Sequence, residues 1–135
     1  MKQNDKFREI FEKSPIGILF FDKLGKLTDI NKSALEIAGV SKLEDVKKIN
    51  LFDNATISSK KDELLKKGLI KLQLPLNFDN IRKLIIHNST RSGIAFIDLT
   101  ISVIDSGFLV QIQDITEGKK AEDHFHKEVE RESFL

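Results

Sequence analysis

Three histidines, His87, His124 and His126, are the first residues to consider for metal binding or proton transfer in this chain. The 135 residues include no cysteine, which excludes disulfides, thiolate metal sites and cysteine nucleophiles. His124 and His126 lie two positions apart in a segment with a helical pattern, so they point to different faces and form a poor metal pair. His87 lies in a predicted strand, where we expect an exposed or hydrogen-bonded side chain. We therefore expect no metal site.

A polar cluster next to a predicted turn is the second candidate for chemistry, and it consists of Ser89, Thr90, Arg91 and Ser92. The cluster could bind an anion, although this composition is typical of ordinary loops. The sequence has no glycine-rich phosphate loop, no paired metal-ligand motif and no nucleophile elbow. We therefore expect no enzyme activity from this chain.

The most informative polar residues are Asp114 and Thr116, which flank Ile115 at a predicted strand-to-helix junction. Apolar and polar residues alternate through residues 107–113 and predict a half-buried strand, and a charged helical run follows directly. We expect Thr116 to be the N-cap of the helix, and Asp114 to accept hydrogen bonds or pair with a basic side chain. A strand that runs directly into an exiting helix can transmit a change in the core to whatever follows.

The elements that position this junction can be predicted from apolar periodicity and turn residues. We expect helices at residues 5–13, 32–38, 41–47 and 59–67, and strands at residues 16–21, 27–30, 94–104 and 107–113. Strands and helices are segregated along the chain, so the predicted class is α+β with an antiparallel sheet.

Residues 69–88 are ambiguous because they contain two candidate strands, at 69–78 and 81–87. Pro75 cannot donate a ladder hydrogen bond, which favours an edge position for the first candidate. The spacing to the turn at Gly93 favours residues 84–90 as the strand that pairs with residues 94–104.

The bulk composition excludes several functions. The 22 basic and 21 acidic residues nearly balance, so we expect no nucleic-acid partner. No apolar run approaches the roughly 20 residues needed to span a bilayer, and no signal-peptide pattern is present. We therefore expect no direct membrane contact and a cytoplasmic location.

Several segments in order and at specific spacing resemble the PAS domain, the sensory module of signalling proteins. They are residues 12–22, Gly25, Asn31, Gly39, residues 50–52 and residues 114–116. The resemblance implies a sheet of about five strands with short helices on one face. It divides the chain into an N-terminal flanking helix (1–15), a PAS core (16–116) and a C-terminal signalling helix (117–135). Gly118 departs from the family, which commonly has arginine there, and could be a hinge or a frayed first turn.

The resemblance also implies a cavity between the sheet and the short helices, suited to a small metabolite or a fatty-acid-like ligand. The candidate cavity residues, whose simpler interpretation is ordinary hydrophobic core, are Leu19, Phe21, Leu35, Phe52, Ile57, Leu99, Val110 and Ile112. The absence of cysteine excludes thiol-linked chromophores and the cysteine-dependent photochemistry of flavin mononucleotide, whereas flavin adenine dinucleotide stays open. The absence of histidine at 59–67 disfavours haem, because family members that bind haem commonly place an axial histidine on this helix. We expect no coloured cofactor, and at most an unidentified small-molecule ligand.

Apolar stripes at both ends predict a homodimer. The resemblance to PAS domains implies, in addition, a downstream effector domain in the parent chain, such as a histidine kinase. The dimerisation candidates are Phe7, Ile10, Phe11, Ile18, Phe20, Ala121, Phe125 and Val129. The alternative is that the terminal helices fold back on their own sheet. Three functions stay open: a ligand-binding relay through Asp114, Ile115, Thr116 and Gly118, a ligand-free interaction module, and a flavin or haem sensor.

Overall fold

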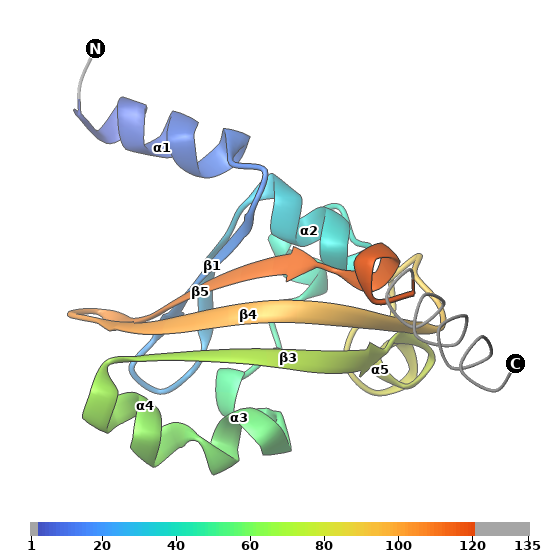
Figure 1. Cartoon of the computed structure of the whole chain (residues 1–135). Helices are drawn as coiled ribbons and strands as arrows, with labels where there is room; N and C mark the ends of the chain where they lie inside the picture. The colour runs from blue at the N-terminus through green and yellow to red at the C-terminus, as the bar shows by residue number, and fades with distance from the viewer. Residues whose placement is uncertain (1–2, 121–135) are drawn as a thin grey trace, which may run out of the picture.

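The computed structural model describes residues 3–120, which form one antiparallel sheet with helices packed against it (Figure 1). The strand order is β2-β1-β5-β4-β3. The strands are β1 (Gly17–Asp22), β2 (Leu27–Ile30), β3 (Leu69–Asn77), β4 (Ile94–Ile104) and β5 (Gly107–Asp114). The predicted α+β class with an antiparallel sheet is confirmed.

The helical elements lie before the sheet, between β2 and β3, and between β3 and β4. They are α1 (Gln3–Lys13), α2 (Lys32–Ala38), the 3₁₀ turns η1 (Leu43–Asp45) and η2 (Leu51–Asp53), α3 (Ala55–Ser59), α4 (Lys61–Lys67) and α5 (Phe78–Leu84). In Figure 1, α3 and α4 lie beside β3, whereas α2 lies beside β1 and β5.

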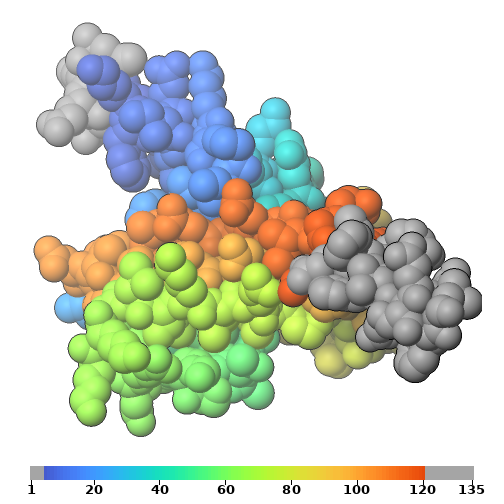
Figure 2. All heavy atoms as spheres, viewed as in Figure 1, coloured from blue at the N-terminus to red at the C-terminus, as the bar shows by residue number. Residues whose placement is uncertain are grey.

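Strand alternation gives the sheet an apolar inner face that holds the core. Leu99 pairs with Ile112 and Ile101 with Val110 across β4 and β5, so these side chains share one face. Phe52 of η2 packs edge-on against Phe108 of that face, with ring centroids 5.2 Å apart. On the opposite, outer face, atoms of β3, β4 and β5 form the visible surface between α1 and α4 (Figure 2).

Residues 78–90 contain no strand, so the strand expected at 81–87 or 84–90 was wrong. The partner of β4 is β3, from Leu69 opposite Ser102 to Asn77 opposite Ile94, rather than residues 84–90. A helix forms after β3 because the Asn77 side chain accepts hydrogen bonds from the Asp79 and Asn80 backbone amides. The edge position expected from Pro75 is confirmed, since β3 is an outermost strand.

The helix expected from Ser59 is also different, because two short helices replace it. Asn54 caps α3 by accepting from the Ile57 amide, and Ser59 is the last residue of that helix. The second helix, α4, ends at Gly68 as expected, in a left-handed conformation that glycine adopts without strain.

Asn31 ties the N-terminal segment to the core at the start of α2. Its side chain accepts hydrogen bonds from the Ile18 and Ala34 amides and donates to the carbonyls of Phe11 and Ile16. Asn31 has no solvent exposure, so each of these bonds offsets the cost of burying a polar group. In the described part of the chain no helix is long and apolar enough to cross a membrane.

Candidate functional site

Asp114, the last residue of β5, accepts hydrogen bonds from both sides of the strand-to-helix junction. Its Oδ1 accepts from the Thr116 amide at 2.9 Å and from the Thr116 hydroxyl. Its Oδ2 pairs with the Arg91 guanidinium at 2.8 Å. Asp114 therefore accepts hydrogen bonds and pairs with a basic side chain, and the prediction named both of these interactions.

Thr116 does not act as the helix N-cap that its sequence position predicts. The helix begins at Thr116 itself, and the Lys119 amide donates to the Ile115 carbonyl, which places Ile115 at the cap position. Asp114 supplies the capping oxygen instead. The Thr116 hydroxyl accepts from the Phe96 amide at 2.9 Å, so it ties the junction to β4.

Phe96 holds the junction through both of its backbone groups. Its amide donates to Thr116, and its carbonyl accepts from the Ile115 amide at 2.8 Å. The start of the exiting helix is therefore an extension of the β4–β5 pairing. A shift of β5 against β4 must strain or break these bonds.

The pKa of Asp114 lies below its ordinary value. Partial burial on its own would raise the pKa of this carboxyl. Hydrogen bonds from the Thr116 side chain and backbone, together with the hydrogen bond and the charge of Arg91, outweigh burial and lower it. The hydrogen bonds and the ion pair of the junction therefore favour the ionised form of Asp114.

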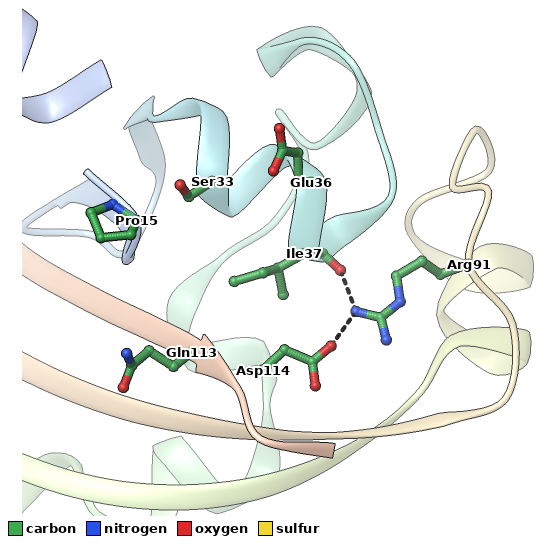
Figure 3. Close-up of a pocket in the computed structure, with 7 residues that line it drawn as sticks. All are labelled: Pro15, Ser33, Glu36, Ile37, Arg91, Gln113 and Asp114. Carbon is green, nitrogen blue, oxygen red and sulfur yellow. Dashed lines mark hydrogen bonds and ion pairs between the residues drawn. The ribbon is translucent and has the colours of Figure 1, made fainter. Parts of the chain in front are cut away.

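Arg91 is the residue of this site that the sequence did not single out as a partner of Asp114. It comes from the loop between α5 and β4, and its Nη1 also donates to the Ile37 carbonyl at 3.0 Å (Figure 3). Its guanidinium lies over the Phe78 ring, 4.7 Å from the ring centroid. Within the polar cluster, the side chains of Ser89, Thr90 and Arg91 make hydrogen bonds to other residues of the chain.

A pocket of about 370 Å³ opens beside the ion pair (Figure 3). Its lining comes from the α1–β1 loop, α2, the loop before β4 and the end of β5, and consists of Pro15, Ser33, Glu36, Ile37, Arg91, Gln113 and Asp114. A second pocket of about 570 Å³ lies between the end of α2 and residues 88–90. None of the eight predicted cavity residues lines either pocket.

The eight predicted cavity residues lie together in the hydrophobic core. Five are buried: Leu19, Phe21, Ile57, Leu99 and Val110. The other three, Leu35, Phe52 and Ile112, are partly buried and pack against the same cluster. All eight therefore belong to one hydrophobic core cluster of the described residues, which is the simpler of the two interpretations of these side chains, and their role in binding a ligand stays a prediction.

The N-terminal dimerisation candidates divide into a buried and an exposed group. Phe11 is only 3% exposed, and its ring stacks on that of Phe20, with centroids 5.6 Å apart. Ile18 and Phe20 are half-buried on the outer face. Phe7 and Ile10 are 56% and 67% exposed, so they remain accessible to a partner. Ala121, Phe125 and Val129 lie outside the described residues.

Gly118 and the three histidines are the other residues that the sequence singled out. Gly118 lies within the first turn of the exiting helix, and a Cβ atom there would meet nothing within 4 Å. His87 is exposed, with Nδ1 3.0 Å from the Arg82 carbonyl oxygen. Residues 3–120 contain no group of three acidic, histidine or cysteine side chains able to hold a metal. His124 and His126 lie outside this range.

Comparison with solved structures gives matches among PAS domains. The PAS domain of a Colwellia psychrerythraea protein has a TM-score of 0.67 at 17% identity, covering 86% of this chain and 99% of that one. A PAS domain from a two-component sensor histidine kinase has a TM-score of 0.61 at 10% identity, over 84% and 99%. A domain of a Geobacter sulfurreducens sensory box histidine kinase/response regulator has a TM-score of 0.62 at 13% identity, over 82% and 91%.

These similarities show that the described chain has the PAS fold. The family model described as "PAS domain" matches residues 5–68, in agreement with this fold. Its fold is similar to those of domains from sensor histidine kinases. No curated protein matches it by sequence.

Proposed function

We propose that this PAS domain senses a small ligand in its core and passes the signal through Asp114, Ile115 and Thr116 to a downstream effector such as a histidine kinase. The observation that carries the proposal is the pair of Phe96 hydrogen bonds, which make the start of the exiting helix depend on β4–β5 pairing. The parent protein would work in the cytoplasm, without nucleic-acid or direct membrane contact.

The input side of the proposal rests on the position of the apolar core. Leu99 and Ile112 are cross-strand partners that belong to the ligand-site candidates, and their strands lead to the junction. The partly buried side chains Leu35, Phe52 and Ile112 are the ones that a small apolar ligand would displace at least cost. Occupancy can drive output only if the ligand binds one arrangement of β5 more tightly than the other.

A second candidate function is a ligand-free interaction module that dimerises through its N-terminal helix. Two observations favour it: the core candidates pack against one another, and Phe7 and Ile10 are exposed on α1. Exposed apolar side chains on one helix commonly mark a partner site. A flavin or haem sensor is the third and weakest candidate, because no feature of residues 3–120 indicates a binding site for a coloured cofactor.

Native mass spectrometry of the purified domain, with its visible absorption spectrum, separates the three candidates. Extra small-molecule mass without a visible band is the result expected from the proposed ligand. An unliganded dimer would favour the interaction module, and a visible band would favour the flavin or haem sensor. An unliganded monomer that gains no mass from a metabolite extract would contradict both leading candidates.

A further inference from the structure

The segment formed by residues 78–93, called the strap here, consists of α5 and the loop that leads into β4. The strap is closed at its base, since the Phe78 amide donates to the Gly93 carbonyl at 2.8 Å. Arg82 donates to the Arg91 carbonyl at 2.9 Å, which holds the loop against its helix. Phe78 and Ile86 are buried, so the strap is anchored in the core.

The strap supplies partners to the carbonyls that α2 leaves open at its C-terminus. Arg91 Nη1 donates to Ile37, the Ser89 hydroxyl to Ala38 at 2.7 Å, and the Thr90 amide to Gly39 at 2.8 Å. Three successive helix-end acceptors are therefore satisfied by three successive strap residues. An α-helix cannot satisfy these groups itself, so the strap and α2 position each other.

The packing at this contact leaves little room for independent movement. A Cβ atom at Gly39 would lie 2.7 Å from both Arg91 Cγ and Ser89 Oγ. Ser89 is buried, and its hydroxyl also accepts from the Arg91 amide at 3.2 Å. A displacement of the C-terminus of α2 must therefore move Ser89 and the backbone of Arg91.

The same Arg91 nitrogen bonds to the Ile37 carbonyl and to Asp114 Oδ2, at 3.0 and 2.8 Å (Figure 3). One guanidinium thus joins the end of α2 to the output junction. Both partners of the ion pair are less than one-third exposed, so solvent competes only in part for this contact.

We propose that the strap is a conformational latch that couples the C-terminus of α2 to the exiting helix through Arg91. When α2 and the strap are docked, Arg91 holds Asp114 in the orientation that caps the helix. Undocking withdraws Arg91, frees Asp114 and loosens the first turn at Thr116. This inference rests on the proposed output through the junction, and it adds α2 as a second place from which that output can be set.

Hydrogen exchange measured by NMR at the Phe96 and Thr116 amides tests the latch in the isolated chain. Ser89→Ala removes the hydroxyl bonds to Ala38 and Arg91 without touching Asp114, and roughly fivefold faster exchange at both amides is expected. Asn50→Ala is the matched control: its side chain likewise makes two bonds to backbone, to Leu24 and Phe52. Exchange at the junction should stay unchanged in this control.

Unchanged exchange in Ser89→Ala, or equal acceleration in Asn50→Ala, would overturn the latch. Thr90→Val is the second variant in case Ser89→Ala does not fold, because it removes a bond to the Gly39 carbonyl from an exposed side chain. Junction exchange at the wild-type rate in Thr90→Val would count against the latch in the same way. Such a failure would leave output through Asp114 and Thr116 untouched, since signalling assays of junction variants test that separately.

Discussion

At the scale of single residues, the carboxylate of Asp114 does most to organise the junction. It receives the Thr116 amide and hydroxyl on one oxygen and Arg91 on the other. A charged acceptor with several donors strengthens each of these bonds relative to a neutral one. The stability of the junction should therefore depend on the negative charge at position 114 as well as on the shape of the side chain there.

The depressed pKa of Asp114 predicts an acid-dependent loss of stability. A group whose pKa is lower when folded contributes fully above its ordinary value, about 3.9 for aspartate, and loses that contribution as pH falls through the folded value. Asp114→Asn should therefore cost about 1 kcal/mol of unfolding free energy at pH 7, and progressively less below about pH 4. Urea denaturation of both proteins from pH 7 to pH 2.5 measures this difference.

Asp29→Asn is the control for that pH series, because Asp29 is an exposed aspartate on β2, away from the junction. Its unfolding free energy should follow that of the wild type throughout. A cost for Asp114→Asn that stays constant from pH 7 to pH 2.5 would contradict the role of the charge.

Asp114 and Thr116 could be predicted from the sequence because their signal is local, a polar pair where strand alternation ends. Arg91 could not, since it lies 23 positions from Asp114 and its neighbours have the composition of any loop. The prediction that Thr116 is the N-cap of the exiting helix was also wrong. The sequence shows a hydroxyl at a helix start, but not the Phe96 amide that competes for it.

At the scale of elements, the exiting helix has a weak point at Gly118. Glycine in a helix interior costs up to about 1 kcal/mol relative to alanine, and here no neighbouring atom requires its small size. A stiffer first turn should follow from substitution. Gly118 lies two residues after Thr116, whose hydroxyl is bonded to the Phe96 amide of β4.

Gly118→Ala should slow amide exchange at Lys119 and Lys120 by up to about fivefold, because it favours the helical state of the first turn. Gly68→Ala is the informative counterpart: Gly68 has a positive φ of 81°, so the same substitution should destabilise the chain. Exchange at Lys119 that is unaffected by Gly118→Ala would show that Gly118 does not limit the helix.

Helices and strands could be predicted from the sequence where a local pattern of turn and cap residues marks their ends. The prediction failed where the apolar composition of a segment suits both a helix and a strand. The strands 27–30 and 94–104 and the helix 32–38 agree with β2, β4 and α2, since turn and cap residues bracket each of them. The strand predicted within residues 81–90 was wrong, because Ile81, Ile85 and Ile86 suit a strand by composition. The Asn77 cap and the Asp79–Arg82 pair three positions apart instead favour a helix.

At the scale of the whole molecule, α1 packs on the outer face at β1 and also offers exposed apolar side chains. Phe11 stacks on Phe20 of the sheet, whereas Ile10 turns 67% of its surface to solvent. One helix can thus contribute to the fold and to an interface at the same time. The predicted homodimer would use the exposed side.

Ile10→Glu should shift the molar mass in light scattering from dimer to monomer without changing the thermal unfolding temperature, because the side chain is mostly exposed. Leu24→Glu is the matched control, since Leu24 is 73% exposed at the β1–β2 turn, away from α1. It should leave the mass unchanged. A dimer that survives Ile10→Glu would place the interface elsewhere.

We infer that signals leave this domain through the hydrogen bonds of Asp114 and Thr116. The most direct test is the signalling output of the full-length parent protein carrying Asp114→Ala or Thr116→Ala, with Asp29→Ala as control. Both junction variants should lose the dependence of output on the stimulus, while the control keeps it. Stimulus-dependent output at the wild-type level in both junction variants would show that the signal does not pass through these bonds.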